Sequence, residues 1–313
     1  MKKWIIIFFI GLISAIAMIY VLIPDRIKIN KSVVIQNNIQ GIYRSFSDEK
    51  NWAKWWPVKI AGSEIQHSLN GNNYLISDKT NFSIFIDIVN EKGKYPSSLN
   101  FIPLTKNSFK LEWDTEIPSS NNPLKRLQAY ISAICIKDGF NKIITAIHSY
   151  YINTDRVYGY DIRREFVKDS AFVFTSDSIK GYPTTDMIYA KIAELRNYIA
   201  SQNAIATDSP MVNIYTKDSF YYQTKVALPV NKRLPTSGRI FYRWMLPRGN
   251  MLITNVTGDT KKVEEAYKVV ENYVSDYNLT APAIPFYSFI INRQAEKDST
   301  KWVTRIYYPV MYY

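Results

Sequence analysis

The chain has 313 residues, of which 47% are hydrophobic and 21% are charged. This length suggests about two domains, and this balance excludes an intrinsically disordered chain. The single cysteine, Cys135, excludes an internal disulfide and a thiolate metal cluster, and its apolar neighbours predict a buried thiol. The net charge of +12 arises from Lys and Arg residues spread along the chain, which favours solvated faces over a nucleic-acid-binding block.

An apolar run from Trp4 to Ile23 opens the sequence, between Lys2-Lys3 and Pro24-Asp25-Arg26. About 20 apolar residues match the hydrocarbon thickness of a bilayer as a helix, whereas a cleavable signal peptide has a shorter apolar region. We therefore expect a single transmembrane anchor over 1–25, through residues 4–23. The flanking charges barely discriminate between orientations, and we expect the remainder to lie outside the cytosol, at a bacterial envelope.

Residues 26–153 have the pattern of an α+β domain. Alternating apolar residues from Ile27 to Ile35 predict a strand, and 38–46 fits a short helix. Helical spacing of apolar residues begins after Asn122-Pro123 and resumes after Asp138-Gly139. Between the short helix and this helical stretch lie four strand-like runs, near 74–76, 82–89, 99–102 and 109–117. We expect a curved sheet wrapped on a helix, with a cavity between them.

Several of these features resemble the START-like polyketide cyclase and lipid-transport superfamily (SRPBCC). They are the opening strand, the segment with Trp52, Trp55 and Trp56, the strand containing Trp113, and the final helix led by Asn-Pro. The resemblance covers about 27–153. It implies a deep apolar cavity for lipids or other hydrophobic molecules, with Trp55, Trp56 and Trp113 as candidate ligand contacts.

The second half of the chain, 154–313, contains an internal repeat over about 157–230 and 239–310. Its two halves share one helix-face pattern: Ile188, Ile192, Leu195 and Ile199 in the first, and Val263, Tyr267, Val270 and Val274 in the second. Residues 224–230 likewise match 304–310. Each half predicts strand, helix, strand, strand. Thr184 and Thr260 are candidate helix N-caps, and Pro229 and Pro309 mark strand ends.

Side chains alternate across a strand, which assigns the two faces of the predicted strands. Val212, Ile214, Val226, Leu228 and Ile306 are expected to face the helices. The opposite face then carries Ala227 and the candidate ligand-binding residues Asn213, Tyr215, Lys225, Ser288, Arg305 and Tyr307. Two such units side by side predict a groove of aromatic and polar groups, as is usual for a small-molecule site.

This doubled unit resembles the GyrI-like effector-binding domain, built from SHS2-type repeats. The residues that carry the resemblance are the terminal Thr-Arg-Ile-Tyr-Tyr-Pro-Val (304–310) and Pro210-Met211. It implies a cleft between the repeats for hydrophobic, often cationic, compounds. One departure is Arg305, which stands where family members commonly have a glutamate; its repeat mate is Lys225. This basic pair favours an anion by Coulomb attraction, unless both side chains extend into solvent.

No catalytic, metal-binding or cofactor-binding constellation is recognisable. The two histidines, His67 and His148, are far apart, and Asp161, Glu165 and Asp169 have the spacing of a solvated strand edge. No helix-turn-helix can be placed, so we expect no nucleic-acid partner. The sequence thus predicts a non-enzymatic binding protein for a small hydrophobic or amphiphilic molecule. The alternatives are a hydrolase or cyclase, and an interaction protein with vestigial pockets whose protein partner is unknown.

Overall fold

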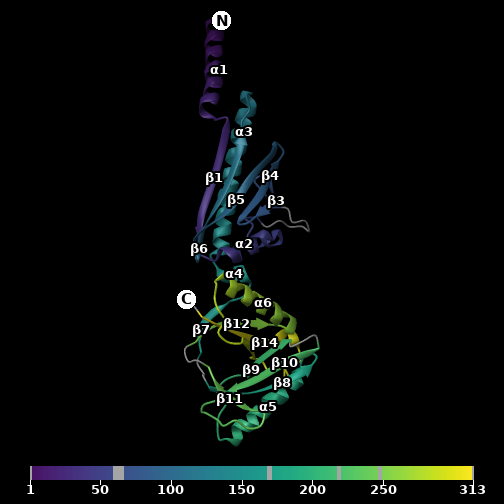
Figure 1. Cartoon of the computed structure of the whole chain (residues 1–313). Coiled ribbons are helices and arrows are strands. Elements are labelled where there is room, and N and C mark those ends of the chain that lie inside the picture. The colour runs from purple at the N-terminus through teal and green to yellow at the C-terminus, as the bar shows by residue number, and fades with distance from the viewer. Residues whose placement is uncertain (1, 59–66, 168–170, 217–219, 246–248, 312–313) are drawn as a thin grey trace. The chain divides into compact units, whose positions relative to one another are not determined.

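The computed structural model describes residues 2–58, 67–167, 171–216, 220–245 and 249–311. The chain divides into two compact units, Met1–Val157 and Tyr158–Tyr313, and both combine helices with one antiparallel sheet (Figure 1). The predicted α+β fold class is therefore confirmed. The assignment of each unit to a particular family stays a prediction.

The first unit is built on a six-stranded sheet in the order β1-β6-β5-β4-β3-β2. Its strands are β1 (Arg26–Ile35), β2 (Ser68–Leu69), β3 (Asn72–Thr80), β4 (Ser83–Asn90), β5 (Gly93–Thr105) and β6 (Ser108–Pro118). Its helices are α1 (Lys2–Leu22), α2 (Ile39–Ser47), the 3-10 helix η1 (Glu49–Lys54), α3 (Pro123–Tyr151) and α4 (Thr154–Tyr158). Asn38 and Asn122 cap α2 and α3 by accepting backbone N–H bonds.

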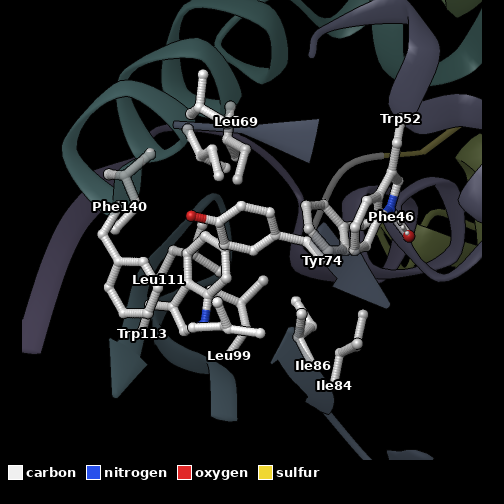
Figure 2. Packing of buried hydrophobic residues seen from close by; sticks show 14 of the residues in the cluster. Phe46, Trp52, Leu69, Tyr74, Ile84, Ile86, Leu99, Leu111, Trp113 and Phe140 are labelled. Atoms are coloured by element: carbon white, nitrogen blue, oxygen red, sulfur yellow. Dashed lines mark hydrogen bonds between the residues drawn. The ribbon is translucent and has the colours of Figure 1, made fainter. Parts of the chain in front are cut away.

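Aromatic side chains fill the space between this sheet and α3. The ring of Trp113 stacks on Phe140 of α3 at 4.1 Å between centroids, and the ring of Tyr74 meets Trp113 edge-on at 5.8 Å. Figure 2 shows Tyr74 among these residues, with Phe46 and Trp52 on its other side. These side chains are buried, so a densely packed aromatic core joins α3 to the sheet.

Helix α3 is one continuous helix of 29 residues, and the apolar spacing on both sides of Asp138-Gly139 belongs to it. Gly139 is needed for packing, because a Cβ at this position would lie 2.5 Å from the hydroxyl of Tyr74. The prediction for Cys135 is wrong, since this cysteine is exposed. Its apolar neighbours do not place it on the buried face of α3.

Helix α1 occupies the apolar run and ends against α3. Arg126 of α3 is buried, and its Nε donates to the carbonyl oxygen of Ile23 at 2.8 Å. Among the residues that the structure describes, no helix is long and apolar enough to cross a membrane. This finding contradicts the predicted single-pass anchor at 4–23, and with it the predicted placement of the remainder outside the cytosol. That prediction rested on the apolar run alone.

The second unit is built on an eight-stranded sheet in the order β11-β8-β10-β9-β13-β14-β12-β7. Its strands are β7 (Arg163–Phe166), β8 (Ala171–Lys180), β9 (Met211–Thr216), β10 (Tyr221–Pro229), β11 (Phe241–Trp244), β12 (Asn250–Thr257), β13 (Phe286–Phe289) and β14 (Val303–Val310). Its helices are α5 (Thr185–Ser201), α6 (Thr260–Asp276) and the 3-10 helix η2 (Ser299–Lys301).

The predicted repeat appears as two β-α-β-β units within this sheet. The first, β8-α5-β9-β10, contributes the strand order β8-β10-β9, and the second, β12-α6-β13-β14, contributes β13-β14-β12. Their inner strands β9 and β13 pair at Val212 with Tyr287 and at Met211 with Ser288. The sheet is therefore pseudo-symmetric about the β9–β13 pair.

The helices cover the face predicted from strand alternation. Val212, Val226 and Leu228 are buried in one cluster with the apolar face of α5, and Ile306 is buried with Val263 of α6. Thr184 caps α5 as predicted. The cap of α6 is instead Asp259, whose side chain accepts from the N–H of Lys262; Thr260 is the first residue of the helix.

Candidate functional site

The face of the eight-stranded sheet opposite to α5 and α6 carries the predicted groove residues in a cross-strand row. Register pairs join Ala227 to Met211, Met211 to Ser288, and Ser288 to Arg305. Lys225 pairs with Asn213 next to this row. Because paired residues share a face, segments from both repeats line one continuous surface.

A cavity of about 350 Å³ lies on this surface and is called here the groove-face cavity. Its walls are mainly apolar, as in small-molecule sites. The lining residues are Phe172, Phe174, Met211, Asn213, Lys225, Ala227, Arg243, Met245, Ala283, Ile284, Phe286 and Pro309. The ring of Phe286 stacks on Tyr307 at 4.7 Å between centroids, which holds it against β14.

The polar groups of the groove-face cavity are two cations and one amide. Lys225 is half-buried, and its ammonium lies 5.6 Å from the ring centroid of Tyr215; Arg243 is exposed. Asn213 donates from Nδ2 to the carbonyl oxygen of Pro285 at 2.8 Å, while its Oδ1 is buried without a hydrogen-bond partner. No carboxylate belongs to the described lining, so the cavity is electropositive and has one free acceptor.

A second, smaller cavity of about 90 Å³ adjoins the first through Met211, Met245 and Phe286 and is called here the acidic recess. Its polar lining residues include Glu165, Asp208, Ser288, Arg305 and Tyr307. Three of the predicted site residues, Ser288, Arg305 and Tyr307, therefore lie together, apart from Asn213 and Lys225. Tyr215 lines a third cavity, beside α6.

Arg305 lines the acidic recess together with Tyr307. Its Nε donates to Oδ1 of Asn255 on the neighbouring strand at 2.8 Å. Burial raises the pKa of Tyr307, the hydrogen bond and charge of Arg305 lower it, and Asp208 and Glu165 raise it. The phenol is therefore protonated at neutral pH and available as a hydrogen-bond donor.

The position of Glu165 differs from the one that the sequence predicts. The spacing of 161, 165 and 169 predicts a solvated strand edge, but Glu165 is half-buried and lines the acidic recess. Strand β7 pairs with β12, which places Glu165 beside Met251. Asp169 lies outside the described residues. A short edge strand far from the repeat motifs gives no signal of this placement in the sequence.

The three tryptophans predicted to contact ligand in the first unit are buried in its aromatic core. Trp55 stacks on Phe46 at 5.2 Å, Trp56 stacks on Trp52 at 5.9 Å, and Trp113 stacks on Phe140. His67 lies between Trp52 and Trp56, at 4.9 and 5.0 Å. Each of the three rings thus packs against other side chains of the unit, and their role as ligand contacts stays a prediction.

Other groove residues were not predicted, although strand alternation could have identified two of them. Phe172 and Phe174 alternate along β8 with the buried Val173 and Thr175, so they occupy the groove face. Arg243 and Ile284 come from segments between the repeat motifs, where periodicity gives no guide. Among the described residues, no three His, Cys, Asp or Glu side chains gather into a metal site.

No protein-family model matches the sequence, and no curated protein matches it. The solved structures similar to parts of the chain include EcmrR in its complex with DNA, at 15% identity and a TM-score of 0.41, covering 61% of this chain and 71% of that one. They also include SAV2435 bound to tetraphenylphosphonium, at 12% identity and a TM-score of 0.32, covering 49% of this chain and 93% of that one.

A START superfamily protein from Mycobacterium smegmatis is similar at 13% identity and a TM-score of 0.29, covering 40% of this chain and 96% of that one. At TM-scores below 0.5, the function of this chain has to be argued from its own residues. The expected absence of a nucleic-acid partner stays a prediction.

Proposed function

We propose that the chain is a non-catalytic binding protein for a small amphiphilic molecule with an anionic head, held in the groove-face cavity. The observation that carries this proposal is the combination of apolar walls, two cations and an unpaired Asn213 oxygen in a cavity of about 350 Å³. Apolar walls bury the ligand body, and a few polar groups fix its orientation.

Each polar group of the cavity has a role in this proposal. Lys225 is half-buried, so its attraction for an anionic head is less screened than that of a fully exposed lysine. Asn213 offers Oδ1 to a hydroxyl or N–H of the ligand, which satisfies a buried acceptor. A cationic head gains nothing from Lys225 and Arg243.

The family assignments form part of the same proposal. We propose that the second unit is a GyrI-like effector-binding domain with a basic cleft. Arg305 stands where family members commonly have a glutamate, and Lys225 is its repeat mate. The first unit is then a START-like domain whose cavity is filled by its own aromatic side chains. Trp113 against Phe140 and Trp52 against Trp56 support this filling.

Native mass spectrometry of the full-length chain, purified without added amphiphile, tests the proposal. We expect an additional bound mass of a small amphiphile, which is lost in Lys225→Glu and retained in Lys232→Glu. Lys232 is an exposed residue outside the described cavity linings, so it controls for the same change in net charge. A mass equal to that of the chain alone, with no thermal shift by anionic amphiphiles, refutes the proposal.

A second candidate function is hydrolysis of a small ester or related compound in the acidic recess. It is favoured by Glu165, a half-buried carboxylate in the same recess as Tyr307 and Arg305. A carboxylate can activate water as a general base, and Tyr307 and Arg305 can donate to a developing oxyanion. Turnover of p-nitrophenyl acetate that is lost in Glu165→Gln supports this candidate; an unchanged background rate in both proteins excludes it for that substrate.

A further inference from the structure

The helix-covered side of the second unit contains a cavity of its own, of about 340 Å³, called here the helix-side cavity. It lies against α6, whose Val263 and Tyr267 line it, and it reaches β9 and β13 near Asn213 and Pro285. Within the described residues, the register pairs that join β9 and β13 are Val212–Tyr287 and Met211–Ser288. The cavity lies where the two strands are no longer paired.

Tyrosines make up much of the wall of the helix-side cavity. The five that line it are Tyr182, Tyr215, Tyr222, Tyr267 and Tyr287. Burial raises the pKa of Tyr267 to about 12 and that of Tyr287 well above its ordinary value. Their hydroxyl groups stay protonated at neutral pH and present hydrogen-bond donors beside flat apolar rings.

Arg293 is the exceptional residue of this wall, because it is a buried cation. It is 8% exposed, and its guanidinium lies 3.8 Å from the ring centroid of Phe289 and 4.5 Å from that of Trp302. Its Nη2 donates to Oγ1 of Thr304 at 2.7 Å, but its Nε is buried without a hydrogen-bond partner. The guanidinium therefore contacts two aromatic rings and one hydroxyl, and none of these groups is an anion.

Within the described part of the chain, no carboxylate lies within 4.0 Å of this guanidinium. Buried charges are ordinarily paired, and arginine does not lose its proton in proteins. An anion entering the cavity would therefore meet a dehydrated cation with an unused N–H group. The other charged lining residues, Glu264, Lys268 and Glu271, are exposed on α6, where solvent screens them.

We propose that the helix-side cavity binds a compact aromatic carboxylate, with Arg293 as its counter-charge and the tyrosine rings around its body. The guanidinium fork suits a carboxylate through its free Nε–H. The aromatic walls favour a flat ligand body. This site shares Asn213 with the groove-face cavity but is otherwise lined by different residues, and it does not depend on the function proposed for that cavity.

The internal repeat generates a related cavity beside α5, lined by Ile192, Arg196 and Phe289. By the repeat offset, Ile192 and Arg196 correspond to Tyr267 and Glu271 of α6. The cavity beside α5 is about 550 Å³ in volume, and its described lining holds no buried charged residue. Of these two cavities, the helix-side cavity is the one with a buried cation in its described lining.

Calorimetric titration of the full-length chain with benzoate, and with its neutral isostere benzamide, tests this proposal. We expect benzoate to bind at least tenfold more tightly than benzamide, and this preference to disappear in Arg293→Met. Lys232→Met, at an exposed position outside the described cavity linings, should leave benzoate affinity unchanged. Equal affinities for the two compounds, no benzoate binding, or retention of the full preference for benzoate in Arg293→Met would overturn the proposal.

A second variant covers the case in which Arg293→Met does not fold. Val263→Phe fills the helix-side cavity from α6 and leaves Arg293 in place. Benzoate should raise the melting temperature of the parent chain and leave that of Val263→Phe unchanged. An equal rise in both proteins places the binding elsewhere and contradicts the assignment.

Discussion

Asn213 in the first repeat donates a hydrogen bond from Nδ2 to the carbonyl oxygen of Pro285 in the second, over 2.8 Å. The two residues lie beside the short β9–β13 pairing that joins the repeats. Pro285 has no N–H group of its own, and the amide of Asn213 satisfies its carbonyl. Oδ1 of the same amide is buried without a hydrogen-bond partner, and Asn213 lines the groove-face cavity, so one side chain joins the repeats and keeps an unused acceptor at the cavity wall.

Asn213→Leu should therefore lower the free energy of unfolding by about 1–3 kcal/mol, the usual cost of leaving a buried polar group unsatisfied. Urea unfolding followed by tryptophan fluorescence measures this change. Gln202→Leu, at the half-buried C-cap of α5, removes an amide that bonds only the neighbouring Ser201 and should be close to neutral. Equal effects of the two substitutions would contradict the role of Asn213.

Gly139→Ala should destabilise the first unit by about 1–3 kcal/mol through overpacking, although alanine is the better helix former. The added Cβ would lie 2.5 Å from the Tyr74 hydroxyl. Tyr74→Phe removes that hydroxyl, which has no hydrogen-bond partner, and should restore most of the lost stability in the double variant. Additive effects of the two substitutions would show that the contact is absent.

His67 predicts a dependence of stability on pH. Burial lowers the pKa of His67, and the nearby Glu49 opposes this by raising it. Since the folded state has the lower pKa, the unfolded chain binds more protons as pH falls below about 6.5, and folding stability decreases. His67→Phe, which keeps a ring between Trp52 and Trp56, should lose this part of the dependence. Identical slopes of the unfolding free energy against pH, measured between pH 7.5 and 5.5 in both proteins, would refute this role of His67.

Arg305→Glu should reverse the charge preference of the acidic recess. Glu165 and Asp208 already line this recess, so the substitution leaves it with three carboxylates and no arginine. We expect tetramethylammonium, a small cation, to bind to Arg305→Glu at least tenfold more tightly than to the parent chain, as followed by equilibrium dialysis. Arg305→Gln, which removes the cation without adding an anion, should give an intermediate affinity. Unchanged affinity in both variants would place the acidic recess outside the binding surface.

The repeat and strand alternation predicted most of what positions the groove. The shared helix-face pattern identified α5 and α6, and period-two alternation placed Lys225, Asn213, Ser288 and Arg305 on one face, as the register pairs confirm. The chain between motifs was harder to predict. Glu165 and Arg243 lie on short edge strands, whose position in the sheet depends on long-range pairing.

Two errors have a common physical origin, because local composition does not determine what a segment packs against. Cys135 has apolar neighbours in the sequence, but it lies on the exposed face of α3. The apolar run at the N-terminus reads as a membrane span, an interpretation that the structure contradicts. Arg293 was missed because a lone arginine beyond β13 has no pattern that signals burial between aromatic rings.

The central claim, an anion-selective groove-face cavity, is tested most directly by the dissociation constants of decanoate and decyltrimethylammonium, measured below their micelle concentrations. These ligands share a chain length and carry opposite charges. We predict that decanoate binds to the full-length chain about tenfold more tightly, corresponding to about 1.4 kcal/mol, and that Lys225→Met removes most of this difference while Lys232→Met does not. Equal affinities for the two ligands, or a preference unaffected by Lys225→Met, would contradict the account.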